Sequence, residues 1–157
     1  MIVVADASPL NYLTLIGEIE LLAALYQKVV IPGEVHRELQ QDRTPQMVRA
    51  WAGALPPWCE VRFVVSVIDP ELDELDPGER DAIQLALEIG VDTVLMDEVR
   101  GRREALRRRL HVTGTVAVLE KAAQQGLIDF QDGLRRLEGT NFRLSPTLRD
   151  EFLKRNS

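Results

Sequence analysis

The sequence predicts a three-layer α/β fold in which a central, mostly parallel sheet of four to five strands is flanked by helices. Short apolar runs rich in β-branched residues alternate with longer segments that carry apolar residues at helical spacing. This order favours parallel strands joined by helical crossovers. The 157 residues suit a single domain over residues 1–157, with residues 129–157 as a helical extension at its C-terminal end.

The first strand is predicted in the opening run MIVVA, which leaves Asp6 at its tip. Ser8 and Pro9 have the form of a helix start, with Ser8 as the cap and Pro9 at the first helical position. Gly17 is a suitable residue to end this helix in a left-handed turn. A second short helix precedes the next strand at Val29 to Ile31.

The middle of the chain is predicted to contain two helices and an edge strand. One helix carries Val35, Glu38 and Leu39, and Pro45 separates it from a helix around Trp51. After the Pro56–Pro57 break, Glu60 to Val67 is rich in β-branched residues, which is typical of a strand.

The helix with the clearest signals begins after Asp76. Asp76 is its predicted cap, Pro77 suits its first position, and Glu79 can complete a capping box. Its apolar stripe faces the sheet and consists of Ala82, Leu85, Ala86 and Ile89. Gly90 is expected to end it.

Thr93 to Met96 is predicted as a strand and is followed by an arginine-rich helix. The last strand is expected at His111 to Thr113 and is followed by a helix from Thr115 to Gln125. Two further helices are predicted over Asp129–Glu138 and Pro146–Arg155.

Composition restricts the chemistry of the chain. No apolar stretch approaches the roughly 18 residues that a membrane span requires, and no signal sequence is recognised, so we expect a cytoplasmic protein without a membrane partner. One cysteine, Cys59, and two histidines make a Cys/His zinc site implausible. A metal would therefore be bound by oxygen, which favours magnesium or manganese.

Two carboxylates follow predicted strands directly. Asp6 ends the first strand and Asp97 ends the strand Thr93 to Met96. The carboxyl ends of parallel strands meet at one edge of a sheet, where ligands bind. Carboxylates that converge there repel one another unless a cation lies between them. A divalent metal site is therefore the leading hypothesis.

Other acids compete for places at this site. Glu98 is the alternative to Asp97, because adjacent residues at a strand exit are not expected to point into one pocket equally well. Glu38 lies on a predicted helix and can equally be a solvated acid that pairs with Arg37. On the capped helix we favour Asp81, with Glu79 as the alternative, since Glu79 already has a role in the capping box.

Other uses of a strand-tip aspartate fit less well. A phosphate-accepting aspartate of the haloacid-dehalogenase kind needs a second aspartate two residues on, where this chain has Ser8. The paired acids of a response-regulator receiver are absent, and so are the glycine-rich phosphate-binding loops.

Six of the ten residues from Arg100 to Arg109 are arginines, although the formal net charge of the chain is −6. Arg100, Arg103 and Arg107 share one helix face and are candidates for contacts with the phosphate backbone of a nucleic acid. The alternative is a solvated face whose arginines pair with acids of the chain.

Five segments together resemble PIN-domain proteins, the metal-dependent ribonuclease fold found in VapC toxins of toxin–antitoxin modules. They are VVADASPL, VVIPGEVHREL, GERDAIQLALEIG, TVLMDE and VTGTVAVL, and the resemblance covers about residues 1–130. The pattern resembles a less characterised branch of the family, with extra C-terminal helices.

The resemblance implies a PIN-like fold and a ribonuclease that hydrolyses phosphodiester bonds with one or two Mg²⁺ or Mn²⁺ ions. The acidic set that it implies is Asp6, Glu38, Asp81 and Asp97, with Ser8 and Thr115 positioning water or phosphate. The implied partners are RNA, an antitoxin protein and a second copy of the chain. A non-catalytic PIN-like module that binds RNA or protein is the main alternative, and a magnesium-dependent phosphatase of small substrates is the third hypothesis.

Overall fold

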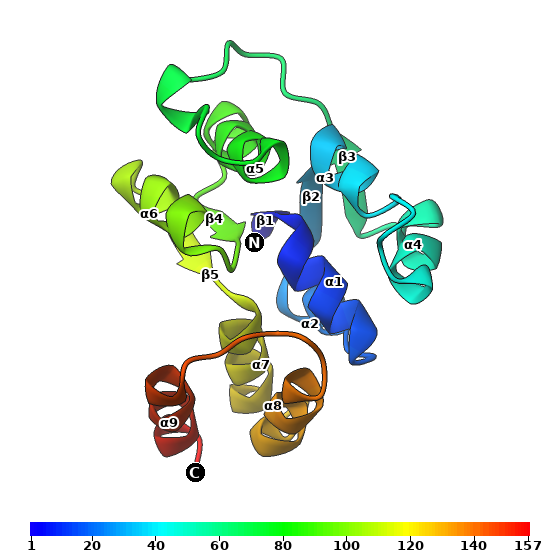
Figure 1. Ribbon diagram of the computed structural model, residues 1–157, viewed down its shortest axis with the longest axis vertical. Coiled ribbons are helices and arrows are strands. Elements are labelled where there is room, and N and C mark those ends of the chain that lie inside the picture. The colour runs from blue at the N-terminus through cyan, green and yellow to red at the C-terminus, as the bar shows by residue number, and fades with distance from the viewer.

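The computed structural model describes residues 1–157 and contains one five-stranded sheet, in which every neighbouring pair of strands is parallel (Figure 1). The strands are β1 (Ile2–Ala5), β2 (Lys28–Pro32), β3 (Cys59–Arg62), β4 (Thr93–Leu95) and β5 (His111–Thr113), in the order β3-β2-β1-β4-β5. The predicted fold class is therefore confirmed. The chain adds β2 and β3 on one side of β1, then β4 and β5 on the other. The direction in which strands are added therefore reverses between β1 and β4. Ligands bind at such a topological switch point in open α/β sheets.

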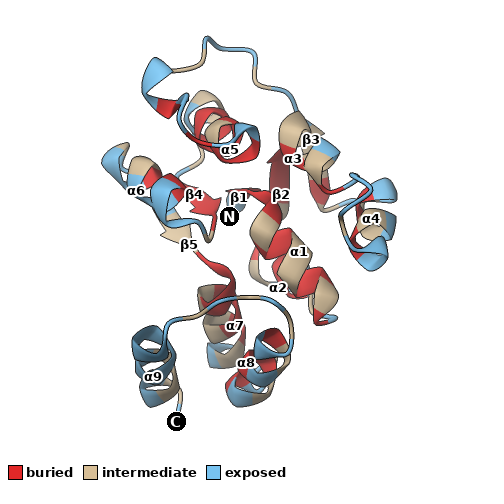
Figure 2. Cartoon of the chain, viewed as in Figure 1, coloured by how far each residue is buried: buried red, intermediate tan, exposed pale blue.

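Helices cover both faces of the sheet (Figures 1 and 2). They are α1 (Ala7–Leu15), α2 (Leu21–Leu25), α3 (Gly33–Glu38), α4 (Gln46–Gly53), α5 (Pro77–Ile89), α6 (Val99–Arg107), α7 (Thr115–Gln124), α8 (Phe130–Glu138) and α9 (Pro146–Arg155), with a short 3₁₀ helix, η1, at Pro70–Leu72. Alternate residues of β1 enter two cores. Val3 packs in the larger core with residues of α1, α2, α7 and α8, and Val4 in the smaller core with residues of α5 and α6.

The third strand is shorter than predicted. It pairs with β2 only from Cys59 to Arg62, whereas the sequence predicted a strand as far as Val67. Beyond Arg62 the chain leaves the sheet because its amides find another partner: the backbone N–H groups of Val65 and Ser66 both donate to Oε1 of Glu88 on α5. The predicted position of β3 at an edge of the sheet is confirmed.

The first helix begins earlier than predicted. Its cap position is Asp6, and Ser8 lies inside its first turn rather than at the cap. No side-chain hydrogen bond caps this helix. The earlier start leaves the Ser8 hydroxyl available for a partner elsewhere in the fold. Gly17 adopts a φ of +76° just past the helix, so the predicted left-handed turn is confirmed.

The start of α5 agrees with the sequence in each detail. Asp76 accepts a hydrogen bond from the Glu79 amide, and the Glu79 side chain accepts one from the Asp76 amide. Pro77 occupies the first turn, and Gly90 ends the helix with a φ of +73°. This capping box fixes the position of Glu79 relative to the sheet edge.

Helices α8 and α9 follow the parallel sheet and pack beside α7. Asp129 caps α8 instead of opening it. Phe130 of α8 stacks on Phe152 of α9 with 6.2 Å between ring centroids, and Arg155 forms an ion pair with Glu120 of α7. None of the helices has the length and apolar character that crossing a membrane would require.

Candidate functional site

A cavity of about 370 Å³ opens at the carboxyl ends of β1 and β4, at the switch point of the sheet. Six carboxylates line it, together with one cation, Arg43. The acids are Asp6, Glu38, Asp76, Glu79, Asp97 and Glu98. They come from the ends of β1 and β4, from α3, and from the N-terminal ends of α5 and α6. Segments far apart in sequence therefore bring acids of one charge to one cavity.

Asp97 is held by three hydrogen bonds. Oδ1 accepts from the backbone N–H of Thr115 at 2.7 Å, and Oδ2 accepts from the Thr115 hydroxyl at 2.7 Å and the Ser8 hydroxyl at 2.6 Å. Thr115 is fully buried at the N-terminal end of α7, where the helix dipole also favours a negative charge. Ser8 and Thr115 thus orient a carboxylate. Their predicted contact with water or phosphate stays a prediction.

Asp6 is a buried carboxylate, with 6% of its surface exposed. Burial raises its pKa well above the usual value, and the neighbouring charges of Asp76, Glu79 and Glu38 raise it further, although the amide of Ala7 acts in the opposite direction. No side chain of the protein donates a hydrogen bond to Asp6. A buried acid surrounded by acids has no compensating charge within the protein, so a cation would relieve the repulsion.

The remaining acids are affected in the same direction. Burial and the charge of Asp76 raise the pKa of Glu79 to about 7. Burial, and then Asp76, also raise the pKa of Glu38, which Arg43 partly offsets. The carboxylates of Glu38, Asp76 and Glu79 line the same cavity as Asp6. A cation bound among these carboxylates would relieve their mutual repulsion.

The structure bears on two choices between acids, Asp81 or Glu79 and Asp97 or Glu98. Asp81 does not line the cavity: its carboxylate pairs with Nε of Arg80 at 2.9 Å, whereas Glu79 does line it. Asp97 and Glu98 both line the cavity, and the expectation that they do not point into it equally well stays a prediction. The strand β4 has already ended at Leu95, so the alternation of side chains along a strand no longer applies.

The donor set suits a hard divalent cation, although no group of three or more Asp, Glu, His or Cys side chains stands close enough to hold an ion by itself. Every charged donor at the cavity is a carboxylate oxygen. Mg²⁺ is usually bound through one or two carboxylates and keeps several waters. A cavity of about 370 Å³ between spaced carboxylates accommodates such a hydrated ion.

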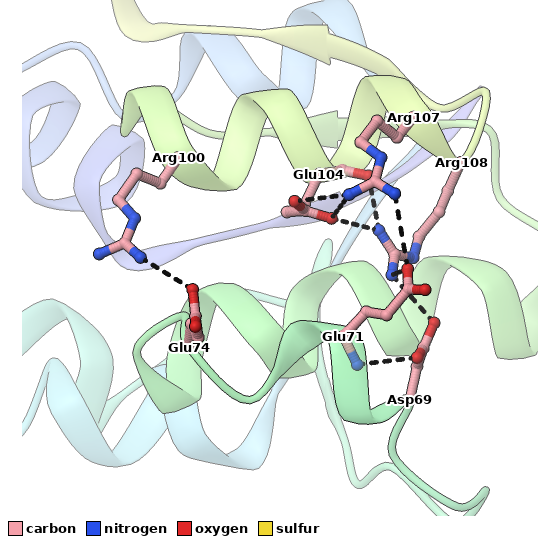
Figure 3. Close-up of polar contacts among 7 residues, drawn as sticks. All are labelled: Asp69, Glu71, Glu74, Arg100, Glu104, Arg107 and Arg108. Carbon is pink, nitrogen blue, oxygen red and sulfur yellow. Dashed lines mark hydrogen bonds and ion pairs between the residues drawn. The ribbon is translucent and has the colours of Figure 1, made fainter.

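Three of the six arginines between Arg100 and Arg109 form ion pairs within the protein (Figure 3). Arg100 pairs with Glu74 at 3.3 Å, and Arg107 pairs with Glu104 at 3.1 Å. Arg108 pairs with Asp69 and Glu104 and so fastens α6 to the segment before α5. None of these arginines lines the cavity. Of the three candidates for RNA contacts, only Arg103 is free of ion pairs. Arg100 and Arg107 instead follow the alternative hypothesis of the sequence analysis, in which the arginines pair with acids of the chain.

Several cavity residues were not singled out from the sequence as site residues. Asn11, Tyr12, Arg43 and Asp76 all line the cavity. Asn11 and Tyr12 lie three and four positions after Ser8, so the three residues share one face of α1. The polar groups that these residues place on one face of an otherwise apolar helix were the sequence signal that could have identified Asn11 and Tyr12. Asp76 was recognised only as a cap, and Arg43 had no local signal.

Comparison with known proteins agrees with this architecture. The family model DUF3368, described as a PIN domain, matches residues 2–157. No curated protein matches the chain. The family match spans nearly the whole chain, and the five-stranded parallel sheet flanked by helices is consistent with a PIN-like fold. The chain belongs to the PIN-domain family.

Proposed function

We propose that the protein is a metal-dependent ribonuclease that hydrolyses RNA phosphodiester bonds with Mg²⁺ or Mn²⁺. The observation that carries the proposal is the group of six carboxylates around one cavity, in which Asp97 is fixed by three hydrogen bonds and Asp6 has no compensating charge. PIN domains commonly act as nucleases and usually bind these ions, and membership of the family supports the proposal.

Asp6 and Asp97 would hold the ion from adjacent strands, with Glu79 and Glu38 on the facing helices. When bound, such an ion activates water and stabilises the charge of the departing oxygen. Ser8 and Thr115 keep the Asp97 carboxylate in one orientation. Because the Asp97 side chain is already held in place, it would lose little conformational freedom when it binds an ion.

Arg43 would contact the substrate phosphate. It is the one cation at the cavity, it forms no ion pair, and its only hydrogen bond joins Nε to Gln41 Oε1 at 3.0 Å. A guanidinium that is free of carboxylate partners can donate two parallel hydrogen bonds to a phosphate. In an otherwise acidic cavity it offsets the repulsion between the carboxylates and the polyanion.

The test uses Asp6→Asn and Asp97→Asn, which keep the side-chain shape and remove one charge each. We expect both variants to lose Mn²⁺-dependent cleavage of single-stranded RNA and to keep the circular dichroism spectrum of the parent. Asp150→Asn on α9 is the matched control, since Asp150 is exposed and lies outside the cavity. Unchanged cleavage by both variants would falsify the proposal.

Calorimetric titration with Mn²⁺ distinguishes the alternatives. A non-catalytic module with a dead site shows no stoichiometric binding that depends on Asp6 and Asp97. A phosphatase turns over nucleotides but not RNA. The toxin role, the antitoxin partner and the homodimer of the sequence analysis stay predictions.

A further inference from the structure

We propose that Tyr12 is the platform on which a nucleobase of the bound RNA stacks, and that residues 139–145 hold its ring in place. This inference rests on the proposed ribonuclease function and adds a residue that contacts a base rather than a phosphate. Tyr12 is the only aromatic residue among the fourteen that line the cavity. It follows Ser8 by one helical turn, and Ser8 is bonded to Asp97.

Two residues of the connection between α8 and α9, a connection that can be followed in Figure 1, contact Tyr12. Its hydroxyl donates a hydrogen bond of 2.9 Å to Oδ1 of Asn141, which is 129 residues away in sequence. Phe142 meets the Tyr12 ring at right angles, with an interplanar angle of 84° and 4.9 Å between centroids. A ring fixed at two points loses little side-chain entropy when a ligand binds, so it is preorganised for contact.

The charges at the cavity indicate which part of a nucleotide Tyr12 would meet. Six carboxylates repel phosphate groups, but they do not repel an uncharged base. An aromatic ring accepts the π-face of any base, and this contact tolerates sequence. Arg43 is the one cation at the cavity and would contact the phosphate, and Tyr12 is the one aromatic residue there and would contact the base.

Tyr12 also has a structural role, because its contacts join α1 to the C-terminal segment. A purely structural tyrosine would affect the melting temperature but not the preference of the protein for RNA with bases. The experiment must therefore measure a quantity that depends on the base. An RNA-like chain without bases provides that comparison.

The probes are single strands of about 12 nucleotides: oligoadenylate, and an abasic ribose–phosphate chain of equal length and charge. Dissociation constants are measured by fluorescence anisotropy in EDTA, where turnover is absent. The parent protein should bind oligoadenylate about tenfold more tightly than the abasic chain. Tyr12→Leu should remove this ratio, and Tyr12→Phe, which keeps the ring, should retain most of it.

Phe142→Leu removes one of the two contacts that hold the Tyr12 ring and keeps the hydrogen bond to Asn141, so an intermediate ratio is expected. Phe63→Leu is the matched control, because Phe63 is an exposed aromatic residue outside the cavity. In cleavage assays Tyr12→Leu should raise KM for RNA and leave kcat within about twofold.

A Tyr12→Leu protein that folds and keeps the parental ratio would overturn the inference, as would a parent protein that binds both probes equally. Either result leaves the proposed function intact if the parent cleaves RNA with Mn²⁺. A parent that neither binds nor cleaves RNA would overturn both proposals.

Discussion

The hydroxyl of Ser8 donates a hydrogen bond of 2.6 Å to Oδ2 of Asp97, across 89 residues of sequence. The bond joins the first turn of α1 to the segment after β4, and it exists because α1 begins before Ser8 and leaves the hydroxyl free of a capping role. Together with the hydrogen bonds from Thr115 it fixes the orientation of a carboxylate that lines the cavity. The proposed metal site therefore depends on residues that need not touch the metal.

Ser8→Ala and Thr115→Val should lower the affinity for Mn²⁺ by about tenfold each, because outer partners of a ligand orient it. Thr115→Ser keeps a hydroxyl and should retain most of the affinity. Calorimetric titration of Mn²⁺ into each purified variant measures the effect. Ser66→Ala, on the segment after β3, provides the control, and parental affinity in both Ser8→Ala and Thr115→Val would contradict the role assigned to these hydroxyls.

Glu79→Gln should abolish Mn²⁺-dependent cleavage, whereas Asp81→Asn should leave it within about threefold of the parent. Glu79 lines the cavity and Asp81 does not. Glutamine serves in a capping box as glutamate does, so the helix start should survive the first change. Asp81→Asn weakens only the pair with Arg80. The opposite order of activities would return the ligand role to Asp81.

The difficulty of choosing between Glu79 and Asp81 illustrates what the sequence can predict. The capping box at the start of α5 follows from local residue types and was predicted in detail. Which face of α5 turns toward the cavity depends on how the helix docks on the sheet. The sequence argument used the capping role of Glu79 to place it behind Asp81 as a candidate ligand, but its carboxylate serves the cap and lines the cavity as well.

Strand positions were also predictable, because short β-branched runs between helices are a local signal. The order of the parallel strands brings the residues after β1 and β4 together, so Asp6 and Asp97 reach one cavity as expected. Partners in irregular segments were not predictable. Arg100 meets Glu74 in the irregular segment between η1 and α5, and nothing local in the sequence indicates that this segment runs beside α6.

Stability should depend on pH through the cavity acids. Without a divalent ion, stability should fall as pH rises from about 4.5 to about 7, the ordinary and the folded pKa of the Glu79 carboxyl. The folded state binds the proton more tightly than the unfolded state over this range, so ionisation favours unfolding. Asp6 and Glu38, whose pKa values are also raised, contribute in the same direction. Melting temperatures in EDTA across this pH range measure the trend.

Mn²⁺ should reverse this dependence, because the ion binds ionised carboxylates and must displace their protons. The increase in melting temperature on adding Mn²⁺ should therefore be larger at pH 8 than at pH 6. The double variant Asp6→Asn, Glu79→Gln should show a flatter pH profile in EDTA and little response to Mn²⁺. An equal response of the parent protein at both pH values would show that the ion binds elsewhere.

Arg43→Gln should weaken RNA binding and reduce its dependence on salt. A single phosphate contact changes the slope of log K against log salt concentration by about 0.7 for single strands. Arg100→Gln is the matched control, since Arg100 is already paired with Glu74 and does not line the cavity. Anisotropy titrations at several salt concentrations, in EDTA, give both slopes. A reduced slope in Arg100→Gln with a parental slope in Arg43→Gln would transfer the phosphate contact from the loop before α4 to the arginine-rich helix α6.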